Sequence, residues 1–137
     1  MERKVKILSF EKDDHEAKLF ESAIELGNLR YELKRVSEWK DYIHELMTNN
    51  YDCIVCGGCD LKDYERISTL KSAKEITPYS TFIFLSSSET EGINSEISRR
   101  YKSLNSIPRK NLMDINSKII ESMRSSVESS KISNYWG

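Results

Sequence analysis

The sequence predicts a doubly wound α/β domain, in which five parallel strands form one sheet that helices cover on both faces. Short apolar runs alternate with amphipathic helical patterns along the chain, and strands connected in this way form right-handed crossovers. The 137 residues are 38% hydrophobic and 31% charged, as in one globular domain. We expect the domain to span residues 1–124 and residues 125–137 to be a serine-rich C-terminal tail or linker stub.

The first strand and helix have the clearest boundaries. Residues 5–10 are a short apolar run with a polar exit, which is typical of a strand buried on both faces. Asp13 or Asp14 follows as a helix cap, and Gly27 stands where a helix end needs a positive φ. The apolar positions of this helix fall on one stripe, formed by Ala17, Leu19, Phe20, Ala23, Ile24 and Leu26.

The next two units repeat this order. Residues 31–36 alternate as a strand, Ser37 caps, and residues 39–47 have helical spacing. A third apolar run, residues 52–56, ends at two glycines, and residues 61–73 predict a third helix.

The second half continues in the same way. Residues 81–85 form a buried strand, and a helix carries apolar residues at positions 93, 97 and 101. Residues 104–107 are a weak fifth strand, and residues 112–123 predict the last helix. In such a sheet, ligands collect at the carboxyl ends of the strands.

Three segments of the chain resemble two-component receiver domains. They are residues 6–20, residues 51–56 and residues 77–86, the last of which is similar to receivers of archaeal signalling proteins. The resemblance covers residues 4 to 124 and implies a flavodoxin-like (βα)5 fold with strand order 2-1-3-4-5.

The resemblance also implies five site positions, and this chain departs from the family at several of them. Receivers hold Mg²⁺ with two acidic residues after the first strand, accept the phosphoryl group on an aspartate after the third, and place a Ser or Thr and a Lys after the fourth and fifth. The matching positions here are Glu11, Lys12, Gly57, Ser86 and Arg109. Gly57 has no nucleophile, and Lys12 puts a cation where the metal would sit. Ser106 replaces the family's aromatic switch residue.

Two alternatives would restore part of this site. A shift of two residues would make Asp13 and Asp14 the acidic pair, although the first helix fits the unshifted register. Asp60 or Asp63 would supply a carboxylate downstream, displaced from the pocket. We expect a degenerate pseudo-receiver in which Glu11 pairs with Lys12, Arg109 or both.

The cysteines suggest a different chemistry. Cys53, Cys56 and Cys59 have the spacing of a metal half-site, but residues three apart on a strand point to opposite faces and no fourth cysteine exists. We expect core packing, or a redox-sensitive thiol at Cys59. The two glycines after the third strand lack a nucleotide-binding motif.

The predicted function is phosphorylation-independent signalling through protein contacts, without enzymatic activity, metal or cofactor. The alternative is a flavodoxin-like protein that binds a small anion, a metal or a redox group. The predicted partners are a histidine kinase, an output domain or a second copy, meeting the fourth helix and fifth strand. The cations of that face are Arg99, Arg100, Lys102 and Lys110, beside Arg109. A formal net charge of -1 and the short apolar stretches argue against nucleic acid and membrane partners and favour a cytoplasmic location.

Overall fold

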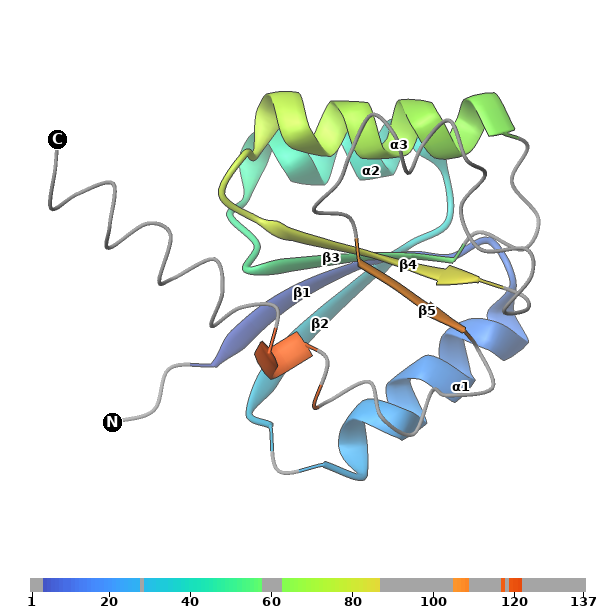
Figure 1. Ribbon diagram of the computed structural model, residues 1–137, viewed down its shortest axis with the longest axis vertical. Helices are drawn as coiled ribbons and strands as arrows, with labels where there is room; N and C mark the ends of the chain where they lie inside the picture. Colours follow the sequence, from blue (N-terminus) through green and yellow to red (C-terminus); the bar gives the residue numbers. More distant parts are fainter. Residues whose placement is uncertain are drawn as a thin grey trace, which may run out of the picture.

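The computed structural model describes residues 4–27, 29–57, 63–86, 105–108, 117 and 119–121. Five parallel strands form one sheet in the order β2-β1-β3-β4-β5, as predicted (Figure 1). The strands are β1 Val5–Phe10, β2 Tyr31–Val36, β3 Cys53–Gly57, β4 Thr81–Ser86 and β5 Asn105–Pro108. The helices described over their length are α1 Asp14–Glu25, α2 Trp39–Thr48 and α3 Asp63–Ile76. The chain therefore has a doubly wound α/β fold.

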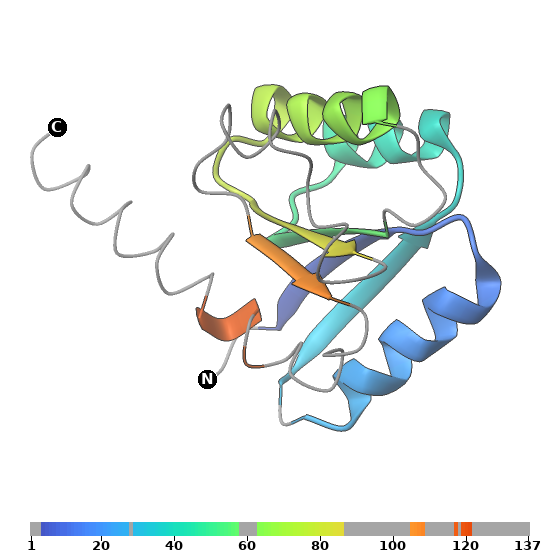
Figure 2. The same ribbon diagram turned by 45° about the vertical axis from the view of Figure 1, so that its right-hand side comes forward.

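The helices lie in two layers. Helix α1 covers one face of the sheet, and α2 and α3 lie side by side on the other (Figure 1; Figure 2). Each face has its own buried cluster. The cluster under α2 and α3 includes Leu8, Phe10, Ile54 and Cys56, whereas the cluster under α1 includes Ile7, Cys53, Val55 and Ile83. The sheet is therefore buried on both faces, because consecutive strand residues alternate between the two clusters.

Two helix boundaries differ from the expectation. The N-cap residue of α2 is Glu38 rather than the predicted Ser37, and the Glu38 side chain makes no capping hydrogen bond. Helix α1 ends at Glu25; its C-cap residue, Leu26, has right-handed helical backbone angles, and Gly27 has no positive φ. The Gly27 N–H instead donates to the carbonyl of Ile24, 3.1 Å away, so a turn of the 3₁₀ type closes the helix. The predicted cap of α1 is confirmed, since the Asp13 carboxylate accepts the N–H of Glu16.

The part of the chain described here includes no helix with the length and apolar character of a membrane span. Residues 122–137, which contain the predicted tail, and most of the predicted fourth and fifth helices lie outside the described residues.

Candidate functional site

The strand register brings several predicted site positions to the carboxyl edge of the sheet. Phe10 of β1 pairs with Cys56 of β3, so the residues that follow them, Glu11 and Gly57, are neighbours at that edge. Gly57 pairs in turn with Leu85 of β4. Ser86 ends β4 at the same edge, and its side chain lies outside the described residues. Arg109 follows β5 and also lies outside them.

Gly57 is buried at the end of β3. The described residues include no glycine with a positive φ, so the backbone at this position is open to any L-amino acid. The glycine is therefore not demanded by the local backbone conformation. Its consequence is chemical, because the strand end has no side chain that can accept a phosphoryl group.

Glu11 is 5% exposed and follows β1 directly. Its N–H continues the sheet by donating to the carbonyl of Val36 at 3.0 Å. Its carboxylate Oε2 accepts the N–H of Asp13 at 3.2 Å, inside the loop between β1 and α1. One role of this buried carboxylate is thus to shape the loop.

Lys12 pairs with a residue in the first turn of α3. Its Nζ lies 3.2 Å from Oε2 of Glu65, and the two side chains are 45% and 26% exposed. The ion pair therefore connects the loop after β1 to α3. We expected Lys12 to pair with Glu11. This prediction is wrong, because the Lys12 ammonium group pairs with Glu65 of α3 instead. Pairing of Glu11 with Arg109 stays a prediction.

Arg35 is a site residue that the sequence reasoning missed. Its Nε and Nη2 donate to the backbone carbonyl of Glu11 at 3.0 and 2.8 Å. Its Nη1 donates to Oδ1 of Asp14 at 2.7 Å, at the first residue of α1. The sequence signal that could have identified Arg35 is the alternation of exposed and half-buried residues along β2, which places this arginine on the same face as Leu33.

The two aspartates after the loop are engaged in building α1. Asp13 caps the helix through Glu16, and Asp14 pairs with Arg35. Glu11, not Asp13, is the first residue past the last β1–β3 pair. This register supports the unshifted alignment, in which Glu11 supplies the carboxylate next to Gly57.

An aromatic cluster flanks the same end of β1. The rings of Phe10 and Tyr42 stack with centroids 4.7 Å apart, and Trp39 lies 5.6 Å from Tyr42. Burial raises the pKa of Tyr42, whose hydroxyl donates to the carbonyl of Thr69 at 2.8 Å. Trp39 is 44% exposed, so this cluster is open to solvent on one side.

The two described cysteines of the motif, Cys53 and Cys56, do not face one another. Cys53 and Cys56 belong to the clusters on opposite faces of the sheet, as predicted. Burial, followed by the nearby charge of Asp52, raises the pKa of the Cys53 thiol and so disfavours the thiolate that metals bind. Among the described residues no three His, Cys, Asp or Glu side chains gather as metal ligands.

Several predicted site residues lie outside the described residues. These are Cys59 and Asp60 after β3, and the cations Arg99, Arg100, Lys102 and Lys110 of the predicted interaction face. Asp63 begins α3, and its side chain is also outside them. The interaction face stays a prediction.

The chain matches no protein-family model and no curated protein sequence. Solved structures do match it. The response regulator domain of Thermotoga maritima CheB has a TM-score of 0.70 at 15% identity, over 89% of this chain and 98% of that one. A CheY-like receiver domain from Methanospirillum hungatei has a TM-score of 0.66 at 14% identity, over 90% and 99%.

The phosphorylated cyanobacterial phytochrome response regulator RcpA is a third match. It has a TM-score of 0.64 at 16% identity, over 90% of this chain and 96% of that one. These likenesses cover nearly the whole of each receiver domain and agree with the strand order β2-β1-β3-β4-β5. The chain has the fold of response regulator receiver domains.

Proposed function

We propose that this chain is a degenerate receiver domain, similar to archaeal receivers, that signals in the cytoplasm through protein contacts without accepting a phosphoryl group. The observation that carries the proposal is Gly57, which ends β3 next to Glu11 on a receiver fold. A receiver fold favours signalling as the role, and the missing nucleophile argues against phosphorylation as the switch.

The charges around the strand edge support the same proposal. Phosphoryl transfer to a carboxylate needs a divalent cation to offset the charge on the transferring oxygens, and Mg²⁺ is held by several hard oxygen ligands. At the position of the second acidic ligand this chain has Lys12, a cation. Asp13 and Asp14, the next carboxylates, bind the N–H of Glu16 and the guanidinium of Arg35. The two aspartates nearest to Glu11 are thus engaged by other groups of the chain, and the second ligand position carries a cation.

The partners that we propose are a histidine kinase, an output domain or a second copy of the chain. The surface proposed for these contacts surrounds the fourth helix and fifth strand, with the cations Arg99, Arg100, Lys102 and Lys110. We propose no enzymatic step for the domain itself.

The test is a phosphorylation assay read by intact mass. The protein is incubated with acetyl phosphate and Mg²⁺, and the RcpA receiver, which is described as phosphorylated, serves as the positive control. We expect the control to gain one phosphoryl group and this chain to gain none. A phosphoryl group that maps to the segment after β3 would contradict the proposal and would direct attention to Asp60 or Asp63.

A further inference from the structure

Strand β2 forms one edge of the sheet. Among the described strands it pairs only with β1, and β5 lies at the opposite edge (Figure 2). An edge strand presents backbone N–H and C=O groups that can pair with another chain, and proteins commonly prevent this with charged side chains along the edge. Strand β2 carries charges at Glu32, Lys34 and Arg35. The order of these charges along the strand determines whether they prevent pairing or direct it.

The hydrogen bonds between β1 and β2 establish which backbone groups of β2 point outward. The N–H of Glu11 donates to the carbonyl of Val36, and the parallel register places Phe10 opposite Val36. The even-numbered residues of β2 therefore bond to β1, because the N–H and C=O of one residue point to the same side of a strand. The residues that point outward are Tyr31, Leu33 and Arg35. None of their backbone groups bonds to another described residue.

We infer that two copies of the chain associate through this edge, with their β2 strands antiparallel and Leu33 facing its counterpart on a two-fold axis. In this register Tyr31 of each copy lies opposite Arg35 of the other. Each outward residue then faces an outward residue, so each pair exchanges two backbone hydrogen bonds. The sheets of the two copies become one continuous sheet.

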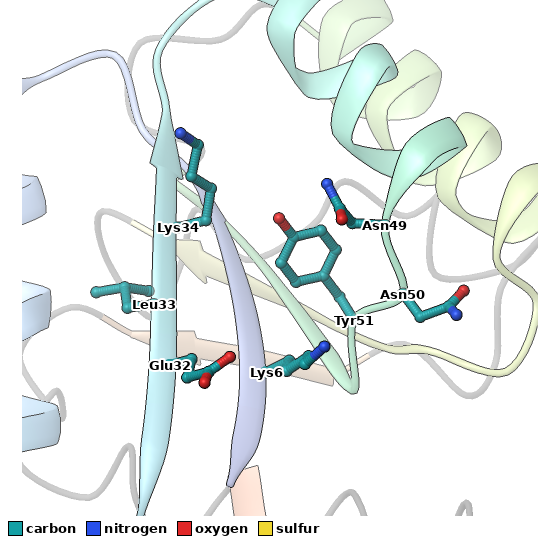
Figure 3. Close-up of a pocket in the computed structure, with 7 residues that line it drawn as sticks. All are labelled: Lys6, Glu32, Leu33, Lys34, Asn49, Asn50 and Tyr51. Atoms are coloured by element: carbon teal, nitrogen blue, oxygen red, sulfur yellow. The ribbon is translucent and has the colours of Figure 1, made fainter.

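The charges of β2 select this register. Glu32 and Lys34 are exposed and extend from one face of the strand, whereas Leu33 extends from the other (Figure 3). In the proposed register Glu32 of each copy lies directly opposite Lys34 of the other, in pairs whose side chains are close. A shift of two residues in either direction places Glu32 opposite Glu32 or Lys34 opposite Lys34. Because like charges directly opposite one another destabilise strand pairing, the proposed register is favoured over both of its neighbours.

The surroundings of Lys34 limit what its charge contributes. Lys34 lies with Lys6 and Tyr51 in the lining of a pocket of about 250 Å³ on the α2 side of the sheet (Figure 3). The hydrogen bond from Tyr51 above all, then the bond from Asn49 and the charge of Lys34, hold the pKa of Glu45 below its ordinary value. The Lys34 charge is therefore partly balanced within its own copy. The cross-strand charge pairs consequently set the register, and the backbone bonds supply attraction that is independent of charge.

The α1 side of the proposed interface is apolar at its centre. Tyr31 and Leu33 pack against the buried cluster under α1, and the two Leu33 side chains meet at the axis. The Arg35 guanidinium can keep its bonds to the Glu11 carbonyl, because only the Arg35 backbone takes part in the pairing. The interface is closed at two copies, since each copy uses the same strand. It is also distinct from the surface proposed above, which surrounds β5 at the opposite edge.

The test is analytical ultracentrifugation of the full chain from micromolar to millimolar concentration. Glu32→Lys and Lys34→Glu each place like charges opposite one another in both cross-strand pairs, and each should weaken dimerisation about fivefold or more. An equal mixture of these two variants should form a heterodimer about as tight as the wild-type dimer, because every pair again joins opposite charges. The matched controls Lys71→Glu and Glu75→Lys, at exposed positions of α3, should leave dimerisation unchanged.

Amide hydrogen exchange provides a second measurement. In dilute protein the outward N–H groups of Tyr31, Leu33 and Arg35 should exchange faster than those of Glu32 and Lys34, and they should become protected where the dimer forms. A dimer that survives both charge reversals, or a mixture that does not recover, would overturn the inference. A chain that stays monomeric throughout would also overturn it, and would leave the edge to an extended segment of another protein. These outcomes are independent of the phosphorylation assay.

Discussion

Arg35 should be the main side chain that holds the loop after β1 in place. The substitution Arg35→Ala removes two hydrogen bonds to the Glu11 carbonyl, at 3.0 and 2.8 Å, and the ion pair to Asp14. A net hydrogen bond contributes about 0.5 to 1.5 kcal/mol, so the two bonds to the carbonyl contribute about 1 to 3 kcal/mol together. The Asp14 side chain is 85% exposed, and an ion pair of this kind contributes under about 1 kcal/mol.

The arithmetic predicts a clear order among three variants. Arg35→Ala should lower the free energy of unfolding by about 1 to 4 kcal/mol, the sum of these contributions. Asp14→Ala, the matched control, should lower it by under about 1 kcal/mol, because it removes only the exposed ion pair. Arg35→Lys should fall between them, since one ammonium group cannot reproduce the planar fork that contacts both the carbonyl and the carboxylate.

Urea unfolding followed by circular dichroism measures all three values, with the m-value as a check that unfolding remains comparable. The double variant Arg35→Ala with Asp14→Ala should be little less stable than Arg35→Ala alone. If Arg35→Ala cost no more than Asp14→Ala, the bonds to the Glu11 carbonyl would contribute nothing measurable. The reasoning that the loop is held through its backbone would then be wrong.

Three further predictions concern the site and the core. Gly57→Asp should fold, because the backbone at this position has no positive φ. Intact mass should show no phosphorylation of this variant until Lys12→Asp and Arg109→Lys are added. Efficient phosphorylation of the single variant would contradict the role of Lys12, which is to place a cation at the metal position. Tyr42→Phe should cost about 0.5 to 1.5 kcal/mol in urea unfolding, since it removes a buried hydroxyl bond to a carbonyl of α3; an unchanged stability would show that water replaces the bond. Because the pKa of Glu45 is lowered in the folded protein, its contribution to stability is present at neutral pH and is lost as pH falls through the folded-state pKa. Glu45→Gln should therefore flatten the pH dependence of the free energy of unfolding at acidic pH. An unaltered slope would contradict this assignment.

The periodicity of the sequence was sufficient for the sheet and its layers. The apolar runs of β1, β3 and β4 place apolar residues on both faces of the sheet. The odd spacing of Cys53 and Cys56 places these two residues in different clusters. The position of Gly57 also followed from the sequence, because the end of an apolar run marks the end of a strand. Local patterns therefore predict what depends on neighbouring residues.

Long-range polar contacts were not predictable in the same way. Lys12 and Glu65 are 53 positions apart, and their meeting depends on how α3 lies over the end of β1. Arg35 reaches a backbone carbonyl, an acceptor that every residue carries and that no pattern marks. The pocket beside Lys6 depends on where α2 ends relative to the strands beneath it, which a helical pattern fixes only to within one or two residues.

The contacts of the loop after β1 bear on whether the domain can switch. The Glu11 N–H bonds to β2, the Arg35 guanidinium donates to the Glu11 carbonyl, and Lys12 forms an ion pair with α3. Three elements of the fold are thereby joined at the strand edge by backbone hydrogen bonds, by the Arg35 guanidinium and by an ion pair. A divalent cation and a phosphoryl group arrive and leave, and a protein that depends on them alternates between two arrangements. Contacts built from Arg35 and Lys12 lie within the chain, so under the proposed function the arrangement at this edge should be constant and regulation should come from the binding of a partner.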